Sequence, residues 1–103
     1  MTVRHIVLMS FPEGIDEDFI ARMSTGLSDM AAAIPEVLSA SWGRDDSSGA
    51  DSWDYALVLD FADEEAYRRY RVHPAHERFI ALFMRDCPIR KARVRYTFDA
   101  RGR

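Results

Sequence analysis

Four stretches of the chain alternate in hydrophobicity with the period of a β-strand, and they cover residues 3–11, 37–44, 53–61 and 89–99. In the first stretch, the neighbouring residues Ile6 and Val7 are both apolar although they point to opposite faces of a strand. The same holds for Leu57 and Val58 in the third stretch. Both faces of these two strands must therefore be covered by other parts of a folded structure.

The second and fourth stretches each have one face that is mainly apolar. In the second stretch, Leu38, Ala40 and Trp42 share a face. In the fourth stretch apolar residues alternate with basic ones, the apolar set being Ala92, Val94, Tyr96 and Phe98 and the basic set Lys91, Arg93 and Arg95. A basic row of this kind is typical of an exposed strand edge.

Between the strands, apolar residues recur at helical spacing in two places. The first helix is predicted over residues 16–34, with Asp16 as its N-cap and Pro35 at its end. Its apolar positions are Phe19, Ile20, Met23, Leu27, Met30, Ala31 and Ile34. The second helix is predicted over residues 64–72 and is broken at Pro74, since proline lacks an N–H and disfavours helix in the residue before it. A further helical segment then places one face toward the sheet, formed by Ala75, His76, Phe79, Ile80 and Phe83.

The predicted order is β-α-β-β-α-β, which is typical of the α+β ferredoxin-like fold, a four-stranded antiparallel sheet with helices on one face. With 103 residues, the chain is expected to form a single domain over residues 1–103. The helices cover one side of this sheet, whereas the first and third strands are apolar on both sides. We therefore expect a second copy of the chain to cover the other side about a two-fold axis, which gives a homodimeric α+β barrel.

The composition narrows the range of partners. A net charge of −3 argues against nucleic acid and against an acidic membrane surface. No apolar run approaches the length of a membrane span, and the start of the chain lacks the apolar core of a signal peptide. The single cysteine, Cys87, excludes an internal disulfide and a cysteine-based metal site, so we expect a cytoplasmic protein.

The candidate chemistry lies in residues 70–76, which hold two of the three histidines. Pro74 is expected to open a new helical segment, which leaves His73 as a kink residue whose ring bonds free N–H groups of that segment. The break allows Tyr70 and His76 to converge in a way that one straight helix does not permit. We interpret His76 as a general base and Tyr70 as a phenol that donates to a substrate oxygen. The alternative is that the histidines are structural.

The same segment, together with two of the strands, resembles a known family. The sequences Arg-His-Ile-Val-Leu at residues 4–8, Tyr-Ala-Leu-Val-Leu-Asp-Phe at residues 55–61 and His-Pro-Ala-His at residues 73–76 resemble the stress-responsive A/B barrel (Dabb) domain. This family includes plant stress proteins and polyketide cyclases of the olivetolic acid cyclase type. The resemblance implies a dimeric ferredoxin-like barrel that works without cofactor or metal, and it carries the catalytic roles onto Tyr70 and His76.

The resemblance also implies a pocket between the sheet and the helices. A first-strand histidine of the cyclases corresponds to His5, and a pocket histidine of their third strand corresponds to Tyr55. The rest of the wall would be apolar, with Val7, Met9, Leu27, Phe79 and Phe83. We expect a small apolar β-keto, polyketide-like ligand there, from which His76 removes a proton while Tyr70 stabilises the enolate, as in a lyase or cyclase.

Other functions remain open from the sequence. A non-catalytic stress-response or structural homodimer needs only the fold, with His76 bonded to a backbone carbonyl. A cofactor-free oxygenase of an aromatic polyketide finds slight support in Trp42 and Trp53. A metal site at His73 and His76 is disfavoured because Pro74 disturbs the helical geometry of a His-x-x-His pair.

Overall fold

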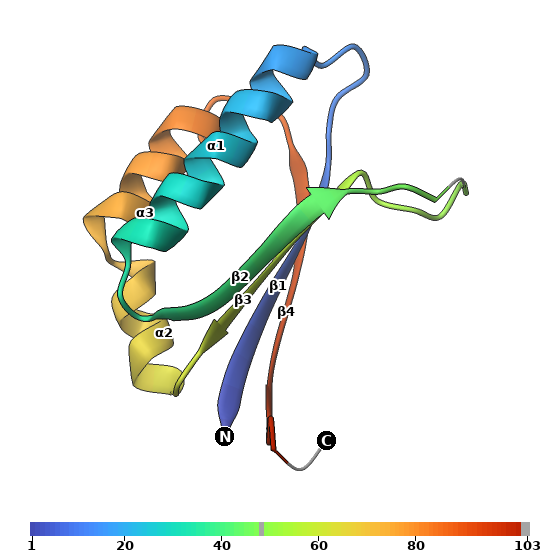
Figure 1. Ribbon diagram of the computed structural model, residues 1–103. Coiled ribbons are helices and arrows are strands. Elements are labelled where there is room, and N and C mark those ends of the chain that lie inside the picture. The colour runs from blue at the N-terminus through green and yellow to red at the C-terminus, as the bar shows by residue number, and fades with distance from the viewer. Residues whose placement is uncertain (48, 102–103) are drawn as a thin grey trace.

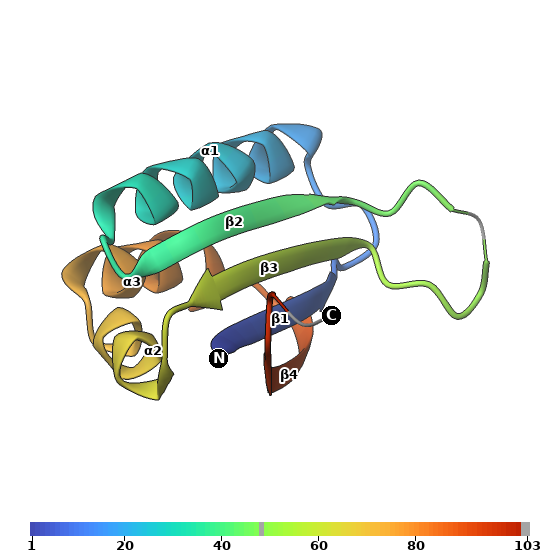
Figure 2. The ribbon, with the colours of Figure 1, turned by 60° about the horizontal axis from the view of Figure 1, so that its bottom comes forward.

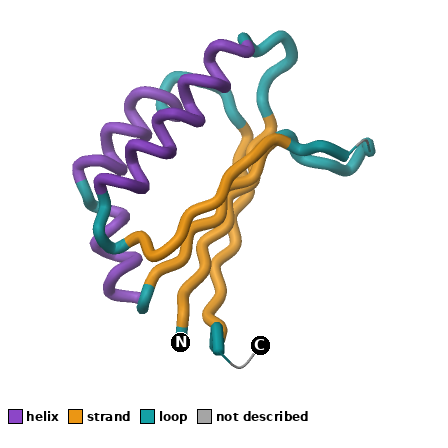
Figure 3. The backbone as a smooth tube through the Cα atoms, in the orientation of Figure 1, coloured by secondary structure: helices purple, strands orange, loops and turns teal. Residues whose placement is uncertain are grey.

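Four strands pair into one antiparallel sheet in the computed structural model, which describes residues 1–47 and 49–101 (Figure 1). The order across the sheet is β2-β3-β1-β4, so the first and third strands lie at the centre. The helices lie on one face of the sheet, as Figures 1 and 3 show. The predicted ferredoxin-like fold is therefore confirmed.

The elements have bounds close to the predicted ones. They are β1 (Thr2–Ser10), α1 (Glu17–Ala33), β2 (Val37–Arg44), β3 (Tyr55–Phe61), α2 (Glu64–Arg71), α3 (Pro74–Phe79), the π-helix η1 (Ile80–Met84) and β4 (Arg90–Phe98). The third strand begins at Tyr55, two residues later than predicted, so Trp53 lies in the loop before it. The predicted helical segment after Pro74 consists of two parts, α3 and η1.

The core lies between the sheet and the helices. Helix α1 begins after Asp16, whose carboxylate accepts from the backbone N–H of Asp18 at 2.9 Å. One face of α1 is buried, with Ile20, Met23, Leu27 and Met30. On the sheet, the buried residues of β1 are Val3, His5, Val7 and Met9, which alternate with partly exposed ones. Figure 2 shows α1 running along β2, with α2 and α3 beside it over the same side of the sheet.

The predicted common face of the β2 residues is wrong for Leu38. The register of β2 on β3 shifts between Val37 and Ser39, which marks a β-bulge. Downstream of the bulge, Ala40 and Trp42 pack against the core, whereas Leu38 is 61% exposed. Because a bulge changes which face a residue takes, alternation alone assigns this residue to the wrong side.

The break before Pro74 separates α2 from α3. Helix α2 ends at Arg71, and the backbone of His73 is extended, with φ −68° and ψ 138°. The imidazole of His73 then caps α3, since its Nδ1 accepts from the backbone N–H of Ala75 at 3.0 Å. Pro74 occupies the first turn of α3, where a missing N–H costs little.

Helix α1 and η1 approach each other closely at a glycine. A Cβ atom on Gly26 would lie 2.5 Å from Cε2 of the Phe83 ring, closer than packed carbon atoms allow. The same ring lies in edge contact with Phe19 and beside Phe79, at centroid distances of 5.9 and 5.2 Å. The absence of a side chain at Gly26 is therefore what lets this aromatic ring lie against α1.

The sheet face that points away from the helices is called the outer sheet face here. Its apolar residues are Ile6, Leu8, Ala56, Val58, Ala92, Val94, Tyr96 and Phe98, which the strand pairing places side by side. Val94 is 53% exposed and Tyr96 is 43% exposed. Among these residues, Arg4 forms a bidentate ion pair with Asp60, with both N···O distances 2.8 Å. An apolar face of this extent is typical of a surface that a protein partner covers.

Candidate functional site

Three elements bring two histidines and two tyrosines together beneath the break between α2 and α3. His5 comes from β1, Tyr67 and Tyr70 come from α2, and His76 comes from the first turn of α3. These four residues are called the histidine–tyrosine cluster. The ring centroids of Tyr70 and His76 lie 4.6 Å apart, and His5 lies 5.3 Å from Tyr67 and 6.2 Å from Tyr70. The structure thus brings His5, Tyr70 and His76 into one site.

Tyr67 is a member of this cluster that the sequence analysis missed. Its ring packs against Phe61 at 5.6 Å and against Tyr70 at 6.0 Å. A signal was present in the sequence, because Tyr67 precedes Tyr70 by three residues and residues at that spacing share a helix face. Tyr67 lies outside residues 70–76, the segment that holds the two neighbouring histidines, and its position in the sequence therefore did not mark it as a site residue.

The orientation of the His76 ring is set by the backbone of the preceding helix. Its Nδ1 lies 3.2 Å from the carbonyl oxygen of Arg71. Because a carbonyl oxygen only accepts, Nδ1 must carry the proton when the imidazole is neutral, and Nε2 then has a free lone pair. The ring is half-buried, so it is reached by solvent on one side.

The surroundings of His5, His76 and Tyr70 favour the uncharged forms of these three side chains. Burial, followed by the positive charges of Arg93 and Arg71, lowers the pKa of His5 from 6.5 to about 4. Burial and the charge of Arg71 also lower the pKa of His76 below its ordinary value of 6.5. Burial raises the pKa of the Tyr70 phenol above 10. At neutral pH the cluster therefore contains neutral imidazoles and a protonated phenol.

Basic side chains flank the cluster on the side of β4. Arg95 pairs with His5 across the two strands, and its guanidinium carbon lies 4.5 Å from the ring centroid of Tyr67. From α2, Arg71 donates to the Tyr67 hydroxyl at 3.1 Å. Arg93 lies two residues before Arg95 and projects from the same face of β4. The largely buried cluster is therefore flanked by three arginine side chains, two from β4 and one from α2.

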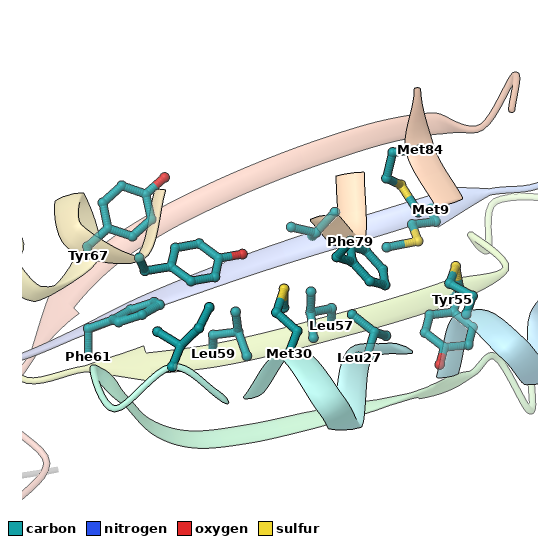
Figure 4. Close-up of a cluster of buried hydrophobic side chains, with 14 of the residues drawn as sticks. Met9, Leu27, Met30, Tyr55, Leu57, Leu59, Phe61, Tyr67, Phe79 and Met84 are labelled. Atoms are coloured by element: carbon teal, nitrogen blue, oxygen red, sulfur yellow. The ribbon is translucent and has the colours of Figure 1, made fainter. Parts of the chain in front are cut away.

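The structure does not bring Tyr55 to this cluster. Its hydroxyl lies 2.6 Å from Oγ of Ser24 on α1, and its ring packs against Phe11. The strand partner of His5 is Leu59, four residues along β3 from Tyr55, which corresponds to about 13 Å. Figure 4 shows Tyr55 at one end of the buried cluster and Tyr67 at the other. Tyr55 is therefore part of the packing at the far end of the core.

The apolar residues predicted to line the pocket also fall into two separate groups. Met9 is the strand partner of Tyr55, and Leu27 is fully buried in the core, so neither adjoins an open space near the cluster. Phe79 and Phe83 instead line a groove of about 870 Å³ between α1 and α3, together with Gly26, Met30, Pro74 and Ala75. No member of the histidine–tyrosine cluster lines this groove, although Ala75, the residue before His76, does.

The two tryptophans also lie outside the cluster. Trp42 pairs with Leu57 in the half of the sheet that contains Tyr55. Trp53 lies beneath the guanidinium of Arg90, 5.4 Å from its ring centroid. Neither ring provides an aromatic wall for a substrate that is bound next to His76.

The low pKa of His5 should make the stability of the protein depend on pH. Between about pH 6.5 and 4 the unfolded chain binds a proton at this histidine while the folded chain does not, so lowering the pH favours unfolding. The full effect of this shift is about 3 kcal/mol in the free energy of unfolding. Urea unfolding at several pH values between 7.5 and 4 measures it.

The matched variant for this measurement is His5→Gln, which has no group that titrates in this interval. Its free energy of unfolding should fall less steeply than that of the unsubstituted protein, and the difference between the two curves isolates His5 from the carboxylates. Parallel curves for the two proteins would show that the pKa of His5 is not lowered by folding.

The fold and the histidine–tyrosine cluster define a small ferredoxin-like α+β domain with a compact polar site beneath a broken second helix. Residues 3–93 match the stress responsive A/B barrel domain, and the chain belongs to this Dabb family.

Relatives and solved structures agree with this assignment. The Stress-response A/B barrel domain-containing protein HS1 of Arabidopsis thaliana is 29% identical over 80% of this chain and 77% of its own. A dimeric ferredoxin-like protein from Thermobifida fusca superposes with a TM-score of 0.84 at 30% identity, over 95% of this chain and 92% of its own. Hydroxynitrile lyase from Passiflora edulis superposes with a TM-score of 0.83 at 19% identity, over 96% and 94%, which shows a shared fold.

Within residues 1–47 and 49–101, no helix is both long enough and apolar enough to cross a membrane. In the same part of the chain, no three side chains of histidine, cysteine, aspartate or glutamate are grouped as ligands for a metal ion.

Proposed function

We propose that this protein is a small-molecule lyase or cyclase that acts on a β-keto substrate by abstraction of a proton next to a carbonyl group, with His76 as the base and Tyr70 as the hydrogen-bond donor. The observation that carries the proposal is the contact between these two rings, at a centroid distance of 4.6 Å, with His76 neutral and partly open to solvent. A half-buried neutral imidazole next to a phenol is a common arrangement for acid–base chemistry.

The hydrogen bond at Nδ1 of His76 determines which ring nitrogen accepts the proton of the substrate. The bond to the Arg71 carbonyl keeps the proton on Nδ1, so Nε2 of His76 is the atom that accepts the substrate's α-proton. The electron pair of the broken C–H bond moves onto the carbonyl oxygen of the substrate. The imidazolium that forms keeps its bond to Arg71, which stabilises the added charge.

Tyr70 supplies the donor for the developing enolate. Its raised pKa keeps the phenol protonated throughout the physiological range, so the hydroxyl always has a hydrogen to donate. A donor that is held in place at such an oxygen contributes about 3 kcal/mol to the stability of the transition state. Phe79 and Phe83, which follow His76 on the same helical segment, provide an apolar surface for the rest of the substrate.

The active form in this proposal is a homodimer that covers the outer sheet face. The apolar residues of that face are exposed or partly exposed in the single chain, and a second copy would bury them against the same residues of its own. The dimeric state of the Thermobifida fusca protein, which is 30% identical, supports this assignment. The Arg4–Asp60 pair would then lie within the interface, with its charges already paired.

Hydrogen–deuterium exchange tests the proposed step without knowledge of the natural substrate. In deuterated buffer, the protein should speed the loss of the α-proton NMR signals of acetoacetate or methyl acetoacetate beyond the rate in buffer alone. Tyr70→Phe should reduce this excess rate about 10²-fold, because the enolate loses its donor. If neither compound exchanges faster with protein between pH 5.5 and 8, the non-catalytic stress-response homodimer is the better assignment.

A further inference from the structure

The imidazole of His5 contains a polar atom that the protein itself does not satisfy. The side chain is 5% exposed, and its Nδ1 has no hydrogen-bond partner among the described residues. An unpaired polar atom in such a position is costly, and its presence often marks a place where a ligand or an ordered water binds. This atom belongs to the same cluster as Tyr70 and His76.

The basic groups around His5 are also short of counter-charges. In residues 1–47 and 49–101, neither Arg93 nor Arg71 forms an ion pair, and the hydrogen bond of Arg71 goes to the uncharged phenol of Tyr67. Arg95 shares the carboxylate of Glu64 with Arg68. Arg93 is the strand partner of Val7, the next residue after His5 on the same face of β1. Arg71 donates to the hydroxyl of Tyr67, whose ring centroid lies 5.3 Å from that of His5. Both arginines therefore flank His5, and their positive charges both disfavour its protonation.

We propose that this site takes a β-keto acid, whose carboxylate binds to Arg93 and Arg71 where β4 lies beside α2. This assignment rests on the proposed function, since it names the substrate class for the same pair of catalytic residues. A chain whose net charge is −3 nevertheless has an excess of positive charge here, which indicates a local requirement for an anion.

The geometry divides the roles between two parts of the site. The guanidinium groups come from β4 and from the last turn of α2, whereas the acid–base pair lies beneath the break that follows α2. A carboxylate held by the guanidiniums would leave the ketone and the α-carbon of the substrate to face Tyr70 and His76. Arginine suits this role because its planar group binds a carboxylate through two parallel hydrogen bonds.

The test compares two probes that differ in charge and share the β-keto group, acetoacetate and its neutral methyl ester. Binding is followed by the shifts of the histidine ring signals in NMR titrations at fixed ionic strength. Acetoacetate should bind about tenfold more tightly than methyl acetoacetate, as expected for one charge-assisted contact at a partly exposed site. Arg93→Gln should abolish this preference by weakening acetoacetate alone, and Arg93→Lys should retain part of it.

Arg90→Gln is the matched control, because Arg90 lies on the same strand but stacks on Trp53 away from the cluster, and it should leave both affinities unchanged. Equal affinities of the two probes, or an unchanged preference in Arg93→Gln, would overturn the proposal. Inorganic phosphate that displaces acetoacetate at equal concentration would also overturn the assignment to a carboxylate.

This measurement separates the substrate class from the catalytic function. Charge-dependent binding without α-proton exchange would keep the carboxylate site and reject the proposed chemistry. Exchange that is equally fast for the acid and the ester, and that Arg93→Gln does not change, would keep the proposed chemistry and reject the carboxylate site.

Discussion

Replacement of His76 by glutamine should lower the rate of α-proton exchange by a factor of 10² to 10⁴, the range in which a general base contributes to catalysis. Glutamine has a side-chain N–H that can still donate to the Arg71 carbonyl, so the variant can keep a hydrogen bond to this oxygen. It has no group that accepts a proton at neutral pH, and the chemical step therefore loses its base. Initial exchange rates of acetoacetate measured by NMR give the factor directly.

The pH dependence of the exchange rate is an independent test of His76 as the base. The base must be unprotonated, so the rate should rise with pH and level off above the pKa of His76, which lies below 6.5. His73→Asn is the matched control, since asparagine retains an acceptor for the Ala75 N–H and should leave the rate unchanged. A rate that is unaffected by His76→Gln would remove this residue from the mechanism.

Introduction of a charge on the outer sheet face should convert the proposed homodimer into monomers. In Val94→Asp, the two-fold axis places a carboxylate in the interface twice, and each copy must lose its hydration without a partner. We expect the dissociation constant to rise more than about 10³-fold, which corresponds to about 4 kcal/mol. Sedimentation equilibrium between micromolar and millimolar concentrations measures this change.

A substitution at Val94 is not expected to disturb the fold of the single chain. Its side chain is already 53% exposed in the single chain, so the variant should keep its secondary structure and its core. Leu82→Asp is the control, because Leu82 is 60% exposed on the helical side and carries the same change away from the sheet. Dissociation in both variants, or in neither, would show that the dimer does not form through the outer sheet face.

Local patterns were sufficient to predict most of the fold. Alternation identified both faces of β1 and β3, and Pro74 identified the break between α2 and α3, because each depends on a few neighbouring residues. The position of Leu38 was not predictable in this way. Its exposure follows from the register shift between β2 and β3, which depends on how two strands pair rather than on either strand alone.

The candidate site was predictable only where its residues lie close in sequence or share a family position. Tyr70 and His76 fall in one short segment, and His5 follows from the resemblance. The placement of Tyr55 depends on the distance along β3 and not merely on its face, so alternation could not separate it from His5. The contact of Arg95 with the Tyr67 ring likewise requires the pairing of β4 with β1 to be known.

The close approach of Gly26 to the ring of Phe83 limits which substitutions the domain can accept at either position. A methyl group at position 26 and a full aromatic ring at position 83 compete for the same volume, so each residue limits what the other can become. An alanine at position 26 requires a smaller or shifted side chain opposite, and a loss of the ring removes the reason for the glycine. The two positions are therefore energetically coupled, so that the effect of a substitution at one depends on which residue occupies the other.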